Sequence, residues 1–241
     1  MNFDRSSLNF DKNKRLKKQI KLIVFHYTGM QSKVEALKKL FNPKSKVSCH
    51  YFIDEIGNVV RVVPEKFSAW HAGKSSWKNF KLLNEFSIGI ELVNPGHEFG
   101  YRNFSKKQIN SLIKISKKLI IKYKISKLNI VGHSDIAPLR KKDPGEKFPW
   151  KKLSKYKIGI WHSLKKNELK KSRKKKTNSV EKKFFFKYVK KIGYQTRFNK
   201  KKTFYENKIV KAFQRRFRPE HISGKIDQEC LLIAKNLSFL R

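Results

Sequence analysis

Short apolar runs separated by helical patterns most strongly limit the fold of this chain. Residues 20–25, 87–93 and 128–131 are rich in β-branched and aliphatic side chains, as buried strands are. Each run is too short to be a helix of ordinary length, and polar or glycine-containing segments bound it. Strands that alternate with helices in this way are typical of α/β folds.

The segments between these runs predict helices and one hairpin. Residues 34–41 and 105–124 repeat apolar side chains at helical spacing, and Ser105 with Gln108 forms the pattern of a capping box. Residues 50–63 read as two strands joined by a Gly-Asn turn. The chain is therefore predicted to be α/β, with a mixed central sheet flanked by helices and followed by a small all-helical domain.

The character of the sequence changes after Trp161. Residues 165–176 are strongly basic and almost without apolar side chains, which favours an interdomain linker. Three short helical patterns follow, and together they could bury one small core. The predicted organisation is a polar N-terminal segment (1–19), an α/β domain (20–161), a basic linker (162–180) and a three-helix domain (181–241).

The formal net charge of +41 would attract any polyanion, including nucleic acid, an acidic cell-wall polymer or an anionic membrane surface. The lysines spread along the whole chain rather than forming one basic arm, which favours solvated faces. No motif that recognises nucleic acid is present, so we expect no specific nucleic-acid partner.

Cysteine usage and the N-terminal segment bear on the compartment. Cys49 and Cys230 lie far apart and are expected to be buried or free thiols. Residues 1–19 are polar, and the run at 20–25 is too short to span a bilayer. We expect a cytoplasmic protein without a transmembrane segment, with the periplasm or cell envelope as the alternative.

Two histidines and an aspartate are candidate metal ligands. His133 and Asp143 lie ten positions apart in a loop bent by proline and glycine, directly after a predicted strand. His26 follows another predicted strand and is the best candidate for a third ligand. Two His and one Asp would leave one coordination position open for water, as catalytic zinc sites do.

Two further side chains stand out. Glu91 interrupts an otherwise apolar strand, so a half-buried carboxylate with a cation or a catalytic duty is predicted there, with a surface-facing carboxylate on an edge strand as the alternative. Trp70 lies in an aromatic loop that could contact sugar or peptide, or could pack over the sheet edge.

Six short stretches, in this order along the chain, resemble the zinc-dependent N-acetylmuramoyl-L-alanine amidases of the AmpD/AmiD type, which are related to the peptidoglycan recognition proteins. The stretches are residues 26–28, 48–51, 69–73, 87–91, 132–138 and 141–145. Residues 212–219 and 224–227 are similar to the small three-helix peptidoglycan-binding domain of AmiD-like members. The resemblance covers nearly the whole predicted α/β domain.

This resemblance implies a reaction and a role for each matching residue. His26, His133 and Asp143 would be the Zn²⁺ ligands, Glu91 the catalytic glutamate, and Lys141 the lysine that faces the reacting carbonyl. The implied reaction is hydrolysis of the amide bond between N-acetylmuramic acid and the L-alanine of the stem peptide, in peptidoglycan or a muropeptide. A non-catalytic peptidoglycan- or muropeptide-binding protein is the alternative.

The stretches that resemble the family also suggest substrate contacts. Trp70, in the matching stretch 69–73, and Asn94, shortly after the stretch 87–91, are predicted to touch substrate. His50, His71 and His97 could line the same cleft, but a hydrogen-bonded structural role is the default for each of them.

Overall fold

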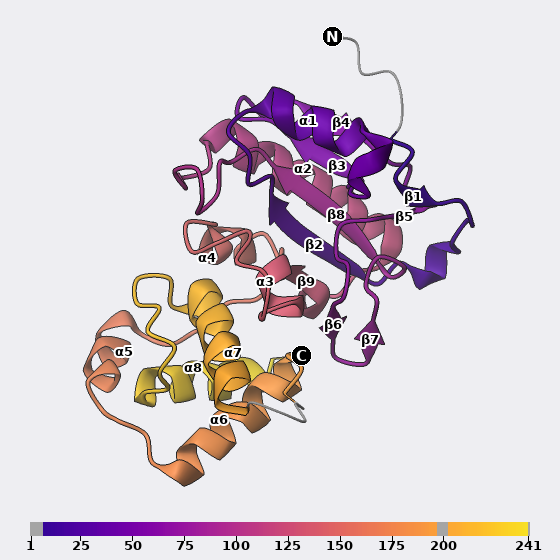
Figure 1. The fold of residues 1–241 in the computed structure, drawn as a ribbon. Helices are drawn as coiled ribbons and strands as arrows, with labels where there is room; N and C mark the ends of the chain where they lie inside the picture. Colours follow the sequence, from indigo (N-terminus) through magenta and orange to yellow (C-terminus); the bar gives the residue numbers. More distant parts are fainter. Residues whose placement is uncertain (1–6, 197–201, 241) are drawn as a thin grey trace.

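The computed structural model describes residues 7–196 and 202–240. Its centre is a five-stranded sheet in the order β4-β3-β8-β2-β9 (Figure 1). Strands β3, β8, β2 and β9 are parallel, and β4 pairs antiparallel with β3 as the predicted hairpin. The mixed central sheet is confirmed. The strand bounds are β2 Leu22–Tyr27, β3 Tyr51–Ile53, β4 Val59–Arg61, β8 Ser87–Leu92 and β9 Ile130–Gly132.

The alternation of side chains along β2 divides the sheet into two faces. Ile23 and Phe25 belong to the apolar cluster that includes Leu112 of helix α2 (Lys106–Tyr123). Leu22 and Val24 belong instead to a cluster that continues into the C-terminal helices. His26 is next in the series on this second face, so the period of two in the strand takes its side chain away from α2.

The two predicted helices of the α/β region are present, as α1 (Lys33–Phe41) and α2. Ser105 caps α2 as predicted, by accepting a hydrogen bond from the Gln108 backbone N–H at 3.0 Å. The predicted capping box is wrong, because the Gln108 side chain turns inward and donates to the Ile53 and Val93 carbonyls at 3.1 and 3.0 Å. Those two carbonyls, at the end of β3 and just after β8, take the side-chain amide in place of the cap.

The N-terminal residues pair with the segment that contains Trp70 and contact the sheet. Strand β1 (Phe10–Asp11) pairs antiparallel with β5 (Ser68–Ala69). The buried Arg15 guanidinium donates to several backbone carbonyls, including that of Ser87 at 2.8 Å. The remaining short elements are β6 Ser76–Trp77, β7 Phe80–Lys81 and the 3₁₀ turns Lys17–Gln19, Pro43–Ser45 and Lys127–Asn129.

The C-terminal part is helical, and the three predicted helices are present as α6, α7 and α8 (Figure 1). The basic stretch 165–176 differs from the predicted linker, because most of it forms α5. Leu169 is buried in the shared core, and Arg173 pairs with Glu229, so one apolar side chain and an ion pair dock this helix. The helix bounds are α3 His133–Ile136, α4 Trp150–Ser154, α5 Lys166–Arg173, α6 Ser179–Ile192, α7 Lys202–Phe217 and α8 Gln228–Ser238.

Among the described residues, the core of the C-terminal helices is continuous with that of the sheet. Phe185 and Phe213 lie in one buried cluster with Leu22, Val24 and Val131 of the sheet. Burial of such side chains is worth about 1.5–3 kcal/mol each, so this contact holds the two parts together strongly. The division into domains at the residues given above stays a prediction.

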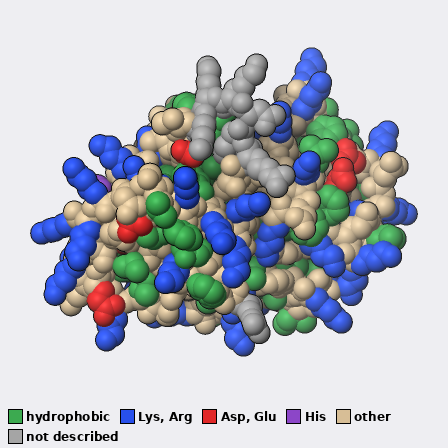
Figure 2. Space-filling model, turned by 90° about the horizontal axis from the view of Figure 1, so that it is seen from below, with side chains coloured by type: hydrophobic (Ala, Val, Ile, Leu, Met, Phe, Trp, Pro, Cys, Tyr) green, Lys and Arg blue, Asp and Glu red, His purple; other side chains and the backbone are tan. Residues whose placement is uncertain are grey.

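The surface and the thiols agree with the sequence. Figure 2 shows lysine and arginine side chains scattered over the face seen from below rather than gathered in one patch. Cys49 and Cys230 are free and buried, as predicted. Within the described ranges, none of the helices has both the length and the apolar character that a membrane crossing requires.

Candidate metal centre

The candidate ligands lie at the carboxyl ends of neighbouring parallel strands. His26 is near the end of β2 and is paired in register with Glu91 of β8. On the other side of β2, strand β9 ends at Gly132, and α3 begins at once with His133. The carboxyl edge of a parallel sheet is where α/β proteins usually place their sites.

The loop that carries Asp143 is fixed against α3. The Ser134 backbone N–H donates to the Asp143 carbonyl at 2.8 Å, and the Tyr101 hydroxyl donates to the Pro144 carbonyl at 2.8 Å. Gly132 permits a close approach, since a β-carbon there would lie 2.6 Å from Cδ of Pro144. These contacts hold Asp143, which lies in a loop and not on a strand, beside the two histidines.

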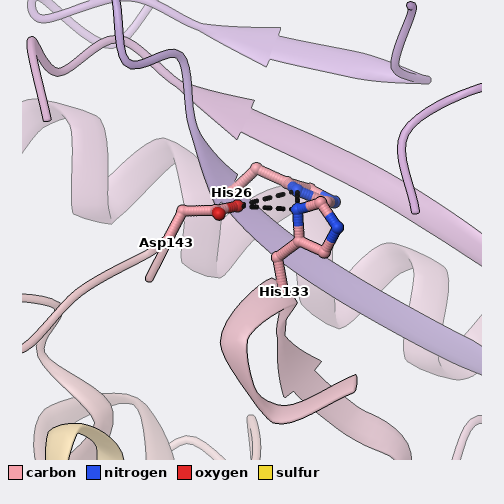
Figure 3. Close-up of side chains that lie close together, drawn as sticks. All are labelled: His26, His133 and Asp143. Carbon is pink, nitrogen blue, oxygen red and sulfur yellow. Dashed lines mark hydrogen bonds and ion pairs between the residues drawn. The ribbon is translucent and has the colours of Figure 1, made fainter. Parts of the chain in front are cut away.

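His26, His133 and Asp143 converge as predicted (Figure 3). Nδ1 of His26, Nδ1 of His133 and Oδ2 of Asp143 form a triangle in which each side measures 3.0 Å. All three residues are buried. A tetrahedral ion with bonds of about 2.0–2.1 Å would space its ligand atoms by about 3.3 Å, so the cluster has nearly the required dimensions.

Hydrogen bonding determines which nitrogen of His133 carries a proton. Nε2 of His133 lies 3.2 Å from the Ala72 carbonyl, which can only accept. This contact is a hydrogen bond when Nε2 carries the proton. In the neutral ring Nδ1 then presents a lone pair to the cluster.

His26 is oriented by a directional chain of hydrogen bonds. The Ser87 hydroxyl donates to the Leu83 carbonyl at 2.5 Å, so its oxygen is left to accept from Nε2–H of His71 at 3.2 Å. Burial lowers the pKa of His71 well below its usual value, so that ring is neutral and its Nδ1 accepts. Nε2 of His26, 3.1 Å away, donates to it. Nδ1 of His26 then carries no proton and also presents a lone pair to the cluster.

The three donor atoms of the cluster face one another at hydrogen-bond distance. Burial, and next the neighbouring His133, lower the pKa of His26 to about 4. Burial alone would raise the pKa of Asp143, but His133 and His26 hold it below its ordinary value, so Asp143 stays ionised. Two imidazole nitrogens and a carboxylate at this spacing fit a metal ion.

Beside the cluster lies a cavity of about 350 Å³. Glu91, Lys141 and Trp70 line it together with the three candidate ligands. Burial, and next the charge of Asp143, raise the pKa of Glu91 well above its usual value. Its Oε2 is buried and has no hydrogen-bond partner among the described residues. A carboxyl group that lines a cavity and has an unpaired oxygen is available to a substrate or a water molecule.

Lys141 and Lys142 both line the cavity, but they differ in exposure and in their electrostatic effect on the site. The charge of Lys141 lowers the pKa of both Glu91 and His26, although other groups affect each pKa more. Lys142 is exposed and has no such effect on either group. Of the two, Lys141 has the surroundings of a group that acts on bound substrate.

The two predicted substrate contacts lie in different surroundings. Trp70 lines the cavity and is partly exposed. Asn94 is buried and outside the cavity lining; its amide donates to the Arg102 carbonyl at 2.8 Å and accepts from the Gly96 N–H at 3.1 Å. Asn94 is thus built into the loop beside the site.

We expected His71 to have a structural role. Its hydrogen bond to His26 defines that role, which is to orient the His26 ring. The sequence contained a signal for it, namely Gly89 inside a buried strand. A β-carbon at Gly89 would lie 2.4 Å from Cγ of His71, so the strand leaves room for the ring. His50 is also hydrogen-bonded, to Arg15 and the Gly89 N–H, while His97 lines the cavity.

An α/β fold with a candidate metal centre at parallel strand ends, beside a half-buried carboxylate, is the arrangement of a metal-dependent hydrolase. Residues 16–146 match the model of a family described as N-acetylmuramoyl-L-alanine amidase. The chain belongs to this family.

Individual relatives resemble both parts of the chain. N-acetylmuramoyl-L-alanine amidase AmiD of Escherichia coli K12 is 32% identical over 233 residues, which are 91% of this chain and 82% of that protein. The 1,6-anhydro-N-acetylmuramyl-L-alanine amidase AmpD of Citrobacter freundii is 39% identical over 105 residues, 44% of this chain and 54% of that protein.

Solved structures extend the likeness to the helical region. E. coli AmiD in complex with anhydro-N-acetylmuramic acid-L-Ala-D-gamma-Glu-L-Lys aligns with a TM-score of 0.80 and 30% identity, over 98% of this chain and 93% of that one. AmpDh3 of Pseudomonas aeruginosa aligns with a TM-score of 0.79 and 28% identity, over 98% and 96%.

Proposed function

We propose that this protein is a zinc-dependent amidase that hydrolyses the bond between N-acetylmuramic acid and L-alanine in peptidoglycan or its fragments. The observation that carries the proposal is the triangle of possible ligand atoms on His26, His133 and Asp143, beside the unpaired Oε2 of Glu91. The solved AmiD complex with an anhydro-muropeptide makes that fragment the first substrate to test.

Zinc, held by His26, His133 and Asp143, would supply a polarised carbonyl and a water molecule with a pKa of about 7. Glu91 removes the proton from the attacking water and delivers it to the departing amine of L-alanine. Its raised pKa suits the second of these transfers, because a carboxyl that binds its proton more tightly in the folded protein can carry it to the leaving group.

Two further side chains act on the substrate. Lys141 donates to the oxyanion that forms on the carbonyl, a contribution of about 3 kcal/mol for a single donor of this kind. Trp70, on the wall of the cavity, packs against the glycan or the peptide. Asn94 supports the neighbouring loop and through it the shape of the substrate site.

A non-catalytic binding protein is the competing proposal, and Glu91 separates the two. Glu91→Gln should retain zinc and lose most turnover of an anhydro-muropeptide, because the amide can neither take nor give the proton. Glu98→Gln is the matched control, since Glu98 also lines the cavity but is exposed. Equal turnover in both variants would contradict the role of Glu91.

Metal content tests the ligand set separately. Asp143→Ala should lower zinc occupancy, because it removes the one charged donor of the cluster. Parental zinc content in that variant would exclude Asp143 from the site.

Two predictions from the sequence remain proposals. Residues 181–241 are proposed to bind peptidoglycan, and a basic hollow of about 750 Å³ between α6, α7 and the chain before α8 supports this. Co-sedimentation with sacculi tests it. The cytoplasmic location is tested by cell fractionation.

A further inference from the structure

Helix α7 of the helical region contacts β9 and α3, the strand before the candidate ligand His133 and the short helix that begins with it. Nη1 of Arg216 lies 2.6 Å from Oδ2 of Asp135, and its Nη2 donates to the Ile130 carbonyl at 3.0 Å. Arg216 is 3% exposed and Asp135 1%. The guanidinium also stacks 4.1 Å above the Trp150 ring. The Trp150 ring therefore contacts the face of the guanidinium, and Asp135 and the Ile130 carbonyl contact its edge.

Asp135 is the link between this arginine and the metal centre. It lies in the four-residue helix α3, which begins with His133, and its Oδ2 accepts from the Gly132 backbone N–H at 2.8 Å. Its Oδ1 accepts from the Tyr194 hydroxyl at 2.6 Å. Burial raises the pKa of Tyr194 well above its usual value, so the phenol stays a donor. Among the residues that the structure describes, the helical region supplies two of the three that bond to this carboxylate.

The neighbouring arginine on α7 reaches the other segment that carries a candidate ligand. Nε of Arg215 lies 3.5 Å from Oε2 of Glu146, three residues after Asp143. Glu146 in turn lies 3.0 Å from Nε2 of His97, a residue that lines the cavity. Consecutive residues of α7 therefore contact the segments of both His133 and Asp143.

The ion pair between Arg216 and Asp135 can fix the orientation of α3. A short helix such as α3 has too few internal hydrogen bonds to set its own orientation, so its contacts with neighbours decide it. A buried charge that loses its partner is strongly destabilised, which means that Asp135 and Arg216 hold one arrangement. Since His133 is two residues from Asp135 in α3, the same contact sets where its ring points.

We propose that Arg216 is a positioning residue of the metal centre, acting on His133 through Asp135, and that the helical region is a structural part of the catalytic site. This inference rests on the proposed function only in requiring that His26, His133 and Asp143 bind a metal. Outer contacts of metal ligands typically change metal affinity by about 10- to 100-fold when they are removed.

The test compares Arg216→Met with Arg218→Met. Arg218 is equally buried and bonded to carboxylates, Asp227 at 2.5 Å and Glu229 at 3.0 Å, but both partners lie within the helical region. Zinc affinity is measured by competition with a chromophoric chelator, and ligand geometry by the visible absorption of the cobalt-substituted protein. Thermal unfolding is followed in parallel.

Arg216→Met should weaken zinc binding by at least about tenfold and shift the cobalt spectrum, whereas Arg218→Met should lower thermal stability and leave both unchanged. Parental affinity and spectrum in Arg216→Met, or an equal loss in both variants, would overturn the inference. Arg216→Lys keeps the charge and should recover part of the affinity.

Tyr194→Phe keeps the test decisive if Arg216→Met does not fold, because it removes one hydrogen bond to Asp135 and no charge. It should weaken zinc binding severalfold, and unchanged binding would count against the inference. A parent protein that binds no metal would instead contradict the proposed function itself.

Discussion

His71→Phe tests the second contact that orients a candidate ligand. The substitution keeps a ring of similar shape but removes the nitrogen that accepts from Nε2–H of His26 at 3.1 Å. Without that acceptor, the neutral His26 ring can place its proton on Nδ1, where Asp143 Oδ2 accepts it at 3.0 Å. Nδ1 is the nitrogen that the metal needs.

The magnitude follows from this choice of tautomer. Metal binding must return the proton to Nε2, where it is a buried donor without a partner, at a cost of about 1–3 kcal/mol. That cost equals a loss of metal affinity of about 5- to 150-fold. The metal-free protein avoids the cost, so the change appears in metal binding more than in folding.

The assay is competition for zinc between the protein and a chromophoric chelator near neutral pH. His50→Phe is the control, because His50 is also buried but bonds to Arg15 and to the Gly89 backbone N–H instead of to a ligand. It should lower stability and leave zinc affinity unchanged. Parental zinc affinity in His71→Phe would refute the tautomer assignment at His26.

Three further predictions concern the same site. The folded-state pKa of Glu91 is raised, so its contribution to stability is fully present below its unfolded pKa and is lost as pH rises towards its folded pKa. In denaturant titrations of the metal-free proteins, Glu91→Gln should therefore gain stability over the parent as pH rises above about 5. The gain should be up to about 1.4 kcal/mol for each pH unit until Glu91 ionises in the folded parent. Gly89→Ala should displace the His71 ring, costing about 1–3 kcal/mol of stability and weakening zinc binding in the same titrations; unaltered binding would show that the ring has room. Lys141→Ala should lower kcat for muropeptide hydrolysis by about 10²- to 10³-fold, and Lys142→Ala should not; a reversed order would exchange their roles.

The parts of the site that could be predicted from sequence depend on local rules. Strand patterns show where a strand ends, and the carboxyl ends of parallel strands meet at one edge, so His26 and His133 could be placed together. A carboxylate inside an apolar strand signals an unusual environment, and Glu91 has one.

The parts that could not be predicted depend on which distant groups compete for a side chain. Gln108 matches a capping box, but two buried carbonyls from other strands take its amide. The segment at 165–176 has a linker's composition, yet Leu169 and a partner for Arg173 in α8 suffice to dock a helix. The pairing of Arg216 with Asp135 joins residues 81 positions apart, and neither position has a local pattern that reports it.

The most direct test of the proposed activity is mass spectrometry of a muropeptide mixture, anhydro-muropeptides with sacculus fragments, after incubation with the purified protein. The reaction is run alone, with a chelator, and with the chelator followed by excess zinc. We expect release of stem peptides that begin with L-alanine, loss of that release with the chelator, and its return with zinc. Intact muropeptides under all three conditions, with the fragments bound to the protein, would contradict the assignment of an amidase.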